Sequence, residues 1–277
     1  MIRHRALLFF LIMLIQQLSQ AAPKAELWAV WLATADTETL QPNHSYWQQF
    51  LARHLTRSSE GVNLLDYSGA LPERENLQRY LQELQRTPVA KLSRPQQLAF
   101  WINLYNAATV ATILDHYPVR SIRDIDISPG LFADGPWDKK FLTIEGLELS
   151  LNDIEHRILR PIWQDNRLHY ALNCASVGCP NLQPKAFTAA NSEALLEAAA
   201  REYINHPRGA QVADRKLSVS SIYKWYQTDF GDNEIGVIQH LKRYAKTTLR
   251  SQLETIEEIE QYDYDWSLNE RKIAGTD

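Results

Sequence analysis

The sequence lacks the features of a membrane-spanning or nucleic-acid-binding protein. Its longest apolar run covers residues 6–15, whereas a membrane span needs about 20 apolar residues. The only comparable stretch, residues 98–114, is interrupted by Asn103 and Asn106, which favours a buried helix. The formal net charge is −4, and a nucleic-acid partner would require a basic face for its phosphates. We therefore expect no nucleic-acid partner and no integral membrane span once the N-terminal segment is removed.

Cysteine is scarce, because Cys174 and Cys179 are the only two in the chain. Their spacing is wider than the Cys-x-x-Cys chelate of common zinc sites. A zinc site built from both cysteines, His169 and Glu155 therefore lacks the usual pattern. Residues 263–267 resemble the start of a calcium-binding loop, but a leucine follows where that loop requires glycine. We expect neither a metal nor a cofactor.

The N-terminus has the pattern of a secretory signal peptide. Basic residues at positions 3 and 5 precede the apolar run, and polar residues lead from it to Ala21. Ser19 and Ala21 give the small-x-small pattern of a cleavage site, which predicts a signal peptide of residues 1–21. No cysteine directly follows the run, so a lipid anchor is not indicated. We expect a mature chain of residues 22–277 that is periplasmic or secreted.

Hydrophobic periodicity predicts a mostly helical N-terminal half. Apolar residues recur at helical spacing over residues 46–55 and 73–85. Ser93 begins a capping-box pattern, Ser-Arg-Pro-Gln, and Pro118 stands at the other end of the next apolar stretch. A helix of residues 94–117 is therefore expected. Because apolar residues nearly encircle it, this should be the central buried helix.

The second half alternates short strands with short helices. Alternating apolar and polar residues predict antiparallel hairpins at residues 141–149 and 212–219, and a last strand is expected at residues 256–264. Helical spacing returns in short stretches, which are residues 151–159, 192–204, 222–227 and 234–245. Helices first and hairpins later indicate a single α+β domain over residues 22–277 rather than a doubly wound parallel sheet.

The segment of residues 167–180 holds both cysteines and is the best candidate for chemistry. It is expected as an apolar strand that carries His169 and opens into a Ser/Gly/Pro turn at Cys174. A cysteine nucleophile needs a nearby base to form its thiolate. We expect Cys174 as nucleophile and His169 as base if the backbone turns just before the cysteine, because five residues of extended strand span about 16 Å. Without that turn, His116 or His206 would have to act as the base.

A third polar group must orient the base, and the candidates are Glu155, Asn103 and Asn106. Glu155 lies near the positive N-terminal end of a predicted short helix. The two amides lie inside the predicted central helix, where each costs free energy unless it is hydrogen-bonded. They either bridge the helix to neighbouring backbone or line a substrate cleft, and the sequence leaves both roles open.

The same cysteines have a second interpretation, which is a structural disulfide between Cys174 and Cys179. Two cysteines across a short turn in an exported chain are what an oxidising compartment joins. Such a bridge would shape the turn and add about 2 kcal/mol of stability. A permanently oxidised Cys174 cannot attack a carbonyl carbon, so the two interpretations exclude each other unless the bridge is labile.

Four motifs follow one another along the chain. They are Trp101-Ile-Asn-Leu-Tyr-Asn-Ala107, Asp153-Ile-Glu155 with Arg160, His169-Tyr-Ala-Leu-Asn-Cys174 followed by Cys179-Pro180, and Tyr264-Asp-Trp-Ser-Leu-Asn269. Together they resemble the bacterial, secreted branch of the domain of unknown function 547 family. The resemblance covers most of residues 70–270. The family has no established reaction, so the resemblance implies membership rather than an activity.

These observations lead to two expected classes of function. The first is an exported enzyme that uses Cys174 for acyl transfer or hydrolysis on a peptide-like or other amide substrate. The second is a non-catalytic periplasmic binding or scaffolding module with a structural Cys174–Cys179 disulfide. In both, the expected ligand is a small molecule or a peptide-like compound. The redox state of the cysteine pair discriminates between the two classes, and the sequence does not fix the oligomeric state.

Overall fold

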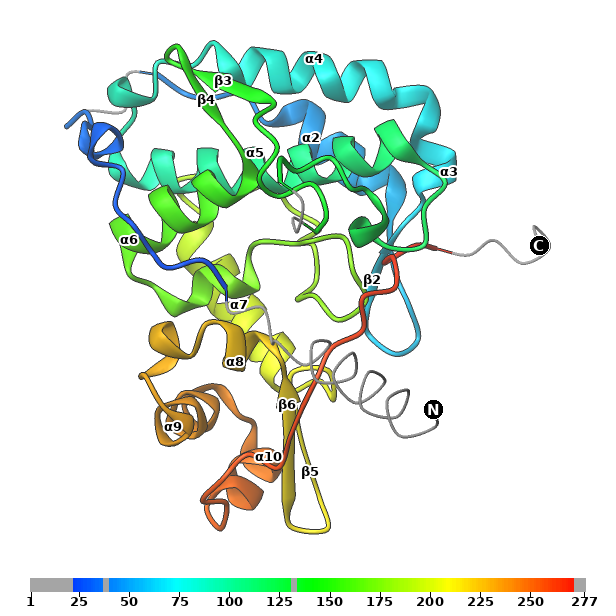
Figure 1. The fold of residues 1–277 in the computed structure, drawn as a ribbon, viewed down its shortest axis with the longest axis vertical. Helices are drawn as coiled ribbons and strands as arrows, with labels where there is room; N and C mark the ends of the chain where they lie inside the picture. The colour runs from blue at the N-terminus through cyan, green and yellow to red at the C-terminus, as the bar shows by residue number, and fades with distance from the viewer. Residues whose placement is uncertain (1–21, 37–39, 131–133, 272–277) are drawn as a thin grey trace, which may run out of the picture.

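A computed structural model describes residues 22–36, 40–130 and 134–271 (Figure 1). The expected α+β fold is confirmed, with helices dominating the first half and short strands interleaved with helices in the second (Figure 1). The elements of the first half are η1 (Ala29–Leu32), α2 (Ser45–His54), β1 (Leu55–Arg57), β2 (Asn63–Leu65), α3 (Tyr67–Ala70), η2 (Leu71–Glu73), α4 (Arg74–Gln85), η3 (Val89–Lys91), α5 (Arg94–His116) and η4 (Ile122–Asp124). Those of the second half are β3 (Leu142–Ile144), β4 (Leu147–Leu149), η5 (Asp153–Leu159), α6 (Arg160–Trp163), η6 (Asn166–Tyr170), α7 (Ser192–Ile204), β5 (Ala210–Ala213), β6 (Lys216–Ser220), α8 (Ile222–Trp225), η7 (Gln227–Phe230), α9 (Glu234–Tyr244), α10 (Thr247–Leu253) and β7 (Gln261–Asp263). The expected signal peptide at residues 1–21 lies outside the described residues.

Helix α5 is the central buried helix that the sequence predicts. Ser93 and Gln96 form the reciprocal capping box at its start, which satisfies amides that have no partner within the first turn. Every residue from 99 to 114 is buried, so neighbouring elements cover the helix on all sides. Among the described residues, no helix is both long enough and apolar enough to cross a membrane.

Three small sheets border the helices. The β3–β4 hairpin confirms the one expected at residues 141–149, and β1 pairs with β2 in the same antiparallel manner. The second expected hairpin forms from β5 and β6, and β7 joins β6 in parallel with Val219 opposite Tyr262. This parallel strand directs the C-terminal segment back across the molecule, where the amide of Val177 donates to the Ser267 carbonyl over 2.8 Å.

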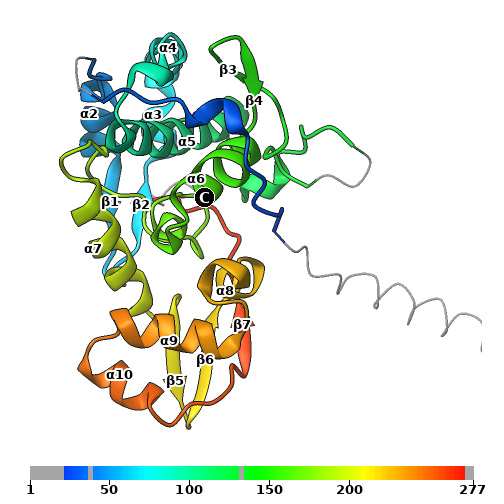
Figure 2. The same cartoon turned by 90° about the vertical axis from the view of Figure 1, so that its left-hand side faces the viewer.

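Buried side chains form two clusters. The larger cluster surrounds α5, and the smaller one packs α9 and the end of α7 against β6 (Figure 2). Helix η6 joins them, because Leu168 and Ala171 belong to the larger cluster and Tyr170 to the smaller one. The candidate site lies at this junction.

The prediction of a strand in the segment of residues 167–180 is wrong. The chain forms the 3-10 helix η6 there and continues as irregular backbone, and Asp165 caps the helix by accepting from the Arg167 amide. Residues 168–173 are all buried, and a short buried run does not show which periodicity its backbone follows. Strand β2, helix α3 and helix α10 were not predicted.

Candidate functional site

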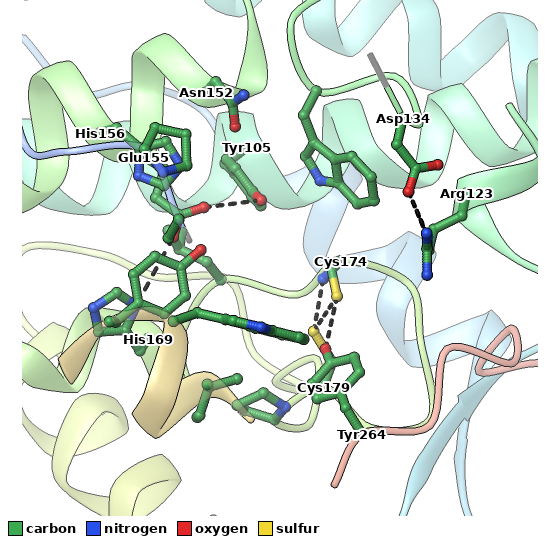
Figure 3. Close-up of a pocket in the computed structure, with 18 of the residues that line it drawn as sticks. Tyr105, Arg123, Asp134, Asn152, Glu155, His156, His169, Cys174, Cys179 and Tyr264 are labelled. Atoms are coloured by element: carbon green, nitrogen blue, oxygen red, sulfur yellow. Dashed lines mark hydrogen bonds and ion pairs between the residues drawn. The ribbon is translucent and has the colours of Figure 1, made fainter. Parts of the chain in front are cut away.

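A cavity of about 590 Å³ (Figure 3) is lined by residues from both buried clusters, among them Leu172 of the larger and Ile222 of the smaller. Among the residues predicted for catalysis, Glu155, His169 and Cys174 line it, whereas Asn103 and Asn106 do not. Its aromatic lining residues are Tyr105, Trp137, Trp225, Tyr226, Tyr264 and Trp266, and its ionisable or thiol-bearing ones are Arg123, Asp134, Asp138, Glu155, His156, His169, Cys174 and Cys179. The walls therefore combine an aromatic surface with acid–base and thiol groups.

Cys174 and Cys179 lie side by side on one wall (Figure 3). Their sulfur atoms are 2.7 Å apart, which exceeds the roughly 2.05 Å of a disulfide bond, and both are free thiols. The expected Cys174–Cys179 disulfide is therefore not formed in this structure. Cys174 is partly exposed and Cys179 is buried, so Cys174 is the thiol that an incoming molecule meets.

The two thiols share hydrogen-bonding groups. The amide of Cys174 donates to Cys179 Sγ over 2.9 Å, and Tyr264 Oη lies 3.0 Å from Cys174 Sγ. Burial and the hydrogen bond with Cys179 raise the pKa of Cys174. Burial also opposes ionisation of Cys179, but hydrogen bonds from Cys174 and Tyr264 outweigh it and lower the pKa of Cys179. The pair therefore loses its first proton from Cys179, while Cys174 stays protonated.

A sharp turn presents Cys174 to the cavity. Ala175 has a φ of 59°, in the left-handed region that residues with a Cβ rarely adopt, and its amide donates to Asn173 Oδ1 over 2.9 Å. The Gly178 amide donates to the Asp265 carbonyl over 2.7 Å. A Cβ at position 178 would lie 2.7 Å from the Asp265 amide nitrogen, so this close approach requires glycine. Strained backbone of this kind concentrates at functional sites.

Asn103 and Asn106 support the site from behind the cavity wall. The Asn103 amide group donates to the Phe187 carbonyl over 2.8 Å and accepts from the Phe187 amide over 3.0 Å. Asn106 donates to the Ala171 carbonyl over 2.9 Å and accepts from the Asn173 amide over 2.8 Å. Of the two roles that the sequence left open, bridging to backbone is the one observed. Asn106 still bears on the site, because it fixes the residue that precedes the exposed thiol.

Glu155 lies on η5, a π-helix, at a wall away from the thiols (Figure 3). Its carboxylate accepts hydrogen bonds from Tyr105 Oη over 3.2 Å and from Tyr226. Burial raises the pKa of Glu155, but the two nearby histidines, Arg160 and the Tyr226 hydrogen bond outweigh burial and hold the pKa below its ordinary value. Glu155 is therefore a buried, ionised carboxylate on the cavity wall, in a helix type often found at functional sites.

His169 lies between two carboxylates. Its Nε2 is 2.7 Å from Asp229 Oδ2, and its Nδ1 is 3.8 Å from Glu155 Oε1. Arg160 donates two hydrogen bonds to Asp229, of 2.6 and 3.0 Å. Burial opposes ionisation of Asp229, but the bonds from His169 and Arg160 hold its pKa well below the ordinary value. The Tyr226 ring packs on the imidazole with 4.0 Å between centroids, so the orientation of His169 is fixed.

The expected contact between His169 and Cys174 is not among the hydrogen bonds of the residues that the structure describes. Both ring nitrogens of His169 face carboxylates, and the Cys174 sulfur contacts Cys179 and two hydroxyl groups. His116 and His206, the other expected bases, bond to main-chain carbonyl groups outside the cavity lining. The group in contact with Cys174 that is able to accept its proton is therefore Cys179.

The start of the described chain forms part of the same cavity. Ala22 and Pro23 line it, and the Pro23 carbonyl accepts a hydrogen bond of 2.7 Å from Arg160 Nη1. Arg160 also donates to His156 Nδ1 over 3.1 Å. Burial lowers the pKa of His156, and in the neutral form of the ring the proton lies on Nε2, because Nδ1 accepts from Arg160. One arginine thus holds the N-terminal segment, a histidine and the Asp229 carboxylate together.

Pro161, which has no amide hydrogen, leaves main-chain carbonyl groups of η5 free to bond to this N-terminal segment. The amides of Glu26 and Trp28 donate to the carbonyls of His156 and Arg157, both over 2.9 Å. Pro161 occupies the position whose amide would bond to the His156 carbonyl in π spacing, or to that of Arg157 in α spacing, and proline has no N–H. The N-terminal segment supplies donors to both carbonyls, and its residues 22 and 23 line the cavity.

Metal binding finds no support in this geometry. Within residues 22–36, 40–130 and 134–271, no group of three or more histidine, cysteine, aspartate or glutamate side chains is arranged to hold a metal ion. In the calcium-loop-like stretch, Asp265 Oδ1 accepts from the Ser267 amide over 2.9 Å, and Asp263 Oδ1 accepts from the Tyr264 amide over 2.8 Å. These carboxylates close local turns.

Comparison with known proteins places the site in a family context. Residues 89–204 match the DUF547 family model. The description of that family is a protein of unknown function. No curated protein and no solved structure matches the chain. The matched segment contains Tyr105, Glu155, His169 and both cysteines, which supports the resemblance that the motifs indicated.

Several site residues were missed by sequence reasoning, and some of them lie after the DUF547 segment. Tyr264 and Trp266 belong to the C-terminal motif, which was the signal that could have located them. Arg160 likewise stood beside the Glu155 motif. Asp229 had no such signal, because its partners are far away in the sequence.

Proposed function

We propose that the cavity is the active site of an exported enzyme that transfers or hydrolyses the acyl group of an amide or peptide-like substrate through Cys174. The observation that carries the proposal is the cysteine pair, in which a partly exposed thiol contacts a buried sulfur of lowered pKa. A thiol that can pass its proton to a neighbouring base is a nucleophile for carbonyl carbon. The strained turn at Ala175 supports the same role, because it holds the thiol on the cavity wall.

The first step of the proposed reaction uses only the two sulfurs and the substrate. Cys174 Sγ bonds to the carbonyl carbon, and its proton passes to the Cys179 thiolate. The C–N bond then breaks, and the departing amine takes the proton from Cys179, which leaves an acyl thioester on Cys174. Water or an acceptor amine attacks this thioester, Cys179 accepts the proton of the attacking group, and Cys174 leaves and is reprotonated from Cys179.

Glu155 and His169 act from another wall. Their positions are fixed by Tyr105, Tyr226 and Asp229, so they form a preorganised polar surface for the nitrogen side of the substrate. His169 thereby serves as a positioning group, in place of the direct base expected from the sequence.

Export is a separate part of the proposal. The basic, apolar and small-residue pattern of residues 1–21 supports cleavage after Ala21 and a periplasmic or secreted location. The four motifs support assignment to the bacterial, secreted branch of the family.

The second candidate function is a binding or scaffolding module whose cysteines form a bridge. It is favoured by the contact between the sulfurs, which lets an oxidant join them with little backbone movement. In that form Cys174 has no thiol to ionise, so it cannot attack a carbonyl carbon, and the cavity would only bind a ligand.

Thiol chemistry on the native protein tests the proposal. The mature protein purified from the periplasm should contain two free thiols, and iodoacetamide near neutral pH should label Cys174 ahead of Cys179. Cys174→Ser should abolish this labelling, whereas Tyr46→Phe, a change outside the cavity lining, should retain it with the fold intact. If the native protein has no free thiol and is two hydrogens lighter than the dithiol form, the enzyme proposal is contradicted and the binding module is supported.

A further inference from the structure

We propose that the aromatic wall beside Cys174, formed by Trp225, Tyr264 and Trp266, is a subsite for a sugar ring, so that the substrate amide is carried on a carbohydrate. This deepens the proposed function by naming its substrate class. The binding part of the inference stands on the wall alone and needs no reaction at the thiol.

The three rings pack against one another at interplanar angles of 32 to 58°. The centroid of Tyr264 lies 4.8 Å from that of Trp225 and 4.7 Å from that of Trp266, and the two tryptophans are 5.5 Å apart. All three rings line the cavity and remain partly exposed. Large aromatic side chains usually dominate cores or interfaces, so a cluster of them left open to a cavity indicates a ligand with an apolar face.

The wall begins at the candidate nucleophile. Tyr264 Oη is 3.0 Å from Cys174 Sγ, and its ring continues into both tryptophans. A carbonyl carbon bonded to the Cys174 sulfur would therefore lie beside Tyr264, the first ring of the aromatic wall (Figure 3).

Polar side chains border the same cavity. Asn152 donates to Asp138 Oδ1 over 2.7 Å, and Arg123 Nε donates to Asp134 Oδ2 over 2.7 Å. The Arg123 guanidinium also lies 5.3 Å from the Trp266 ring centroid, which ties this polar rim to the aromatic wall. A carboxylate accepts more than one hydrogen bond, and guanidinium and amide groups carry several donors, so these side chains keep capacity for a ligand.

A sugar ring matches this combination. A pyranose presents C–H groups on its faces and hydroxyl groups around its edge, so it stacks on the rings while its hydroxyls reach the rim. A purely aromatic ligand would cover the wall but make no hydrogen bonds to the remaining donors and acceptors of the rim. The rim is therefore what selects a carbohydrate over an aromatic peptide side chain.

Binding to a thiol-blocked protein tests the inference. The mature chain with Cys174→Ala is titrated with chitotetraose, cellotetraose and maltotetraose, and with N-acetyltyrosinamide, by calorimetry and tryptophan fluorescence. At least one tetrasaccharide should bind saturably and more tightly than N-acetyltyrosinamide. Adding Trp225→Ala or Trp266→Ala should weaken that binding at least tenfold, and Trp266→Phe should weaken it less. Trp163→Phe, a partly exposed tryptophan outside the cavity lining, is the matched control and should change nothing.

The outcomes separate this inference from the proposed function. No saturable binding of any of the three sugars, tighter binding of N-acetyltyrosinamide, or sugar binding that survives Trp225→Ala and Trp266→Ala would overturn the sugar subsite. If the protein binds a sugar but its native cysteines prove to be fully oxidised, the sugar subsite is supported and the enzyme proposal is contradicted. Should Trp266→Ala fail to fold, the paired Trp225→Ala and Trp266→Phe variants decide the question.

Discussion

The side-chain carbonyl of Asn106 accepts a hydrogen bond of 2.8 Å from the main-chain amide of Asn173. Asn106 lies in the middle of the central helix α5, and Asn173 directly precedes the exposed thiol. The same Asn173 accepts from the Ala175 amide and donates to the Pro180 carbonyl. The most buried helix of the fold therefore fixes the turn that presents Cys174.

We predict that Asn103→Leu and Asn106→Leu each lower the free energy of unfolding by about 2 to 4 kcal/mol, because each orphans one buried amide and one buried carbonyl. Urea denaturation measures both. Only Asn106→Leu should also change the rate at which iodoacetamide labels Cys174. The exposed Gln82→Leu on α4 is the control and should shift stability by less than about 0.5 kcal/mol. Equal labelling in both asparagine variants would show that Asn106 does not position the thiol.

The left-handed conformation of Ala175 gives a second prediction. Ala175→Val should lower the free energy of unfolding by about 2 kcal/mol or more, because a β-branched residue is strained at positive φ. Ala175→Gly should stay within about 1 kcal/mol of the parent, since relief of strain offsets the lost burial of one methyl group. Thermal unfolding compares the pair. A valine variant as stable as the glycine variant would show that the turn is not strained.

The buried ion pair of Arg160 with Asp229 predicts a pH dependence. The pKa of Asp229 is lowered in the fold, so its stabilisation is fully present above the ordinary pKa of about 3.9 and is lost as the pH falls through the lowered value. Asp229→Asn should cost about 3 kcal/mol at pH 7 by leaving Arg160 unpaired and should flatten the loss of stability below pH 4. Asp115→Asn, which breaks the exposed pair with Arg74, should cost less than about 1 kcal/mol. Equal costs for the two variants would contradict the assignment.

The buried His240 predicts a second pH range in which the stability of the fold changes. Burial lowers its pKa to about 4, and its Nε2 is 2.8 Å from Tyr170 Oη. The unfolded chain therefore binds more protons between pH 6.5 and 4, so stability should fall as the pH drops through this range, by up to about 1.4 kcal/mol per pH unit for this one proton. His240→Asn should reduce that slope in urea titrations at pH 6.5, 5.5 and 4.5. His44, whose pKa burial also lowers to about 4, should account for a separate share of it. An unchanged slope in His240→Asn would mean that the histidine titrates normally in the fold.

The N-terminal pattern predicts that the exported protein starts at Ala22. Intact-mass measurement on material from the periplasm or medium should give residues 22–277. Ala21→Glu breaks the small-x-small pattern and should leave uncleaved precursor in the membrane fraction. Exported wild-type protein that retains residues 1–21 would contradict the prediction.

Much of the fold could be predicted because local chemistry decides it. The capping box at Ser93 and the proline after α5 set the limits of the central helix without reference to any distant residue. Helix α7 begins and ends where its apolar spacing indicates, and both hairpins follow from alternating residues around short turns. The segment before Cys174 was predicted wrongly, because its residues are buried throughout and carry no alternation that distinguishes a strand from a 3-10 helix.

The sequence by itself singled out Glu155, His169 and both cysteines, which all line the site, but it did not determine which side chains contact one another. Packing turned His169 toward Asp229, sixty positions away, and brought Tyr264 to Cys174 across ninety positions. Local sequence decides which main-chain hydrogen bonds can form within a short segment. Which side chains meet depends on how whole buried faces pack together, and only the tertiary structure holds that information.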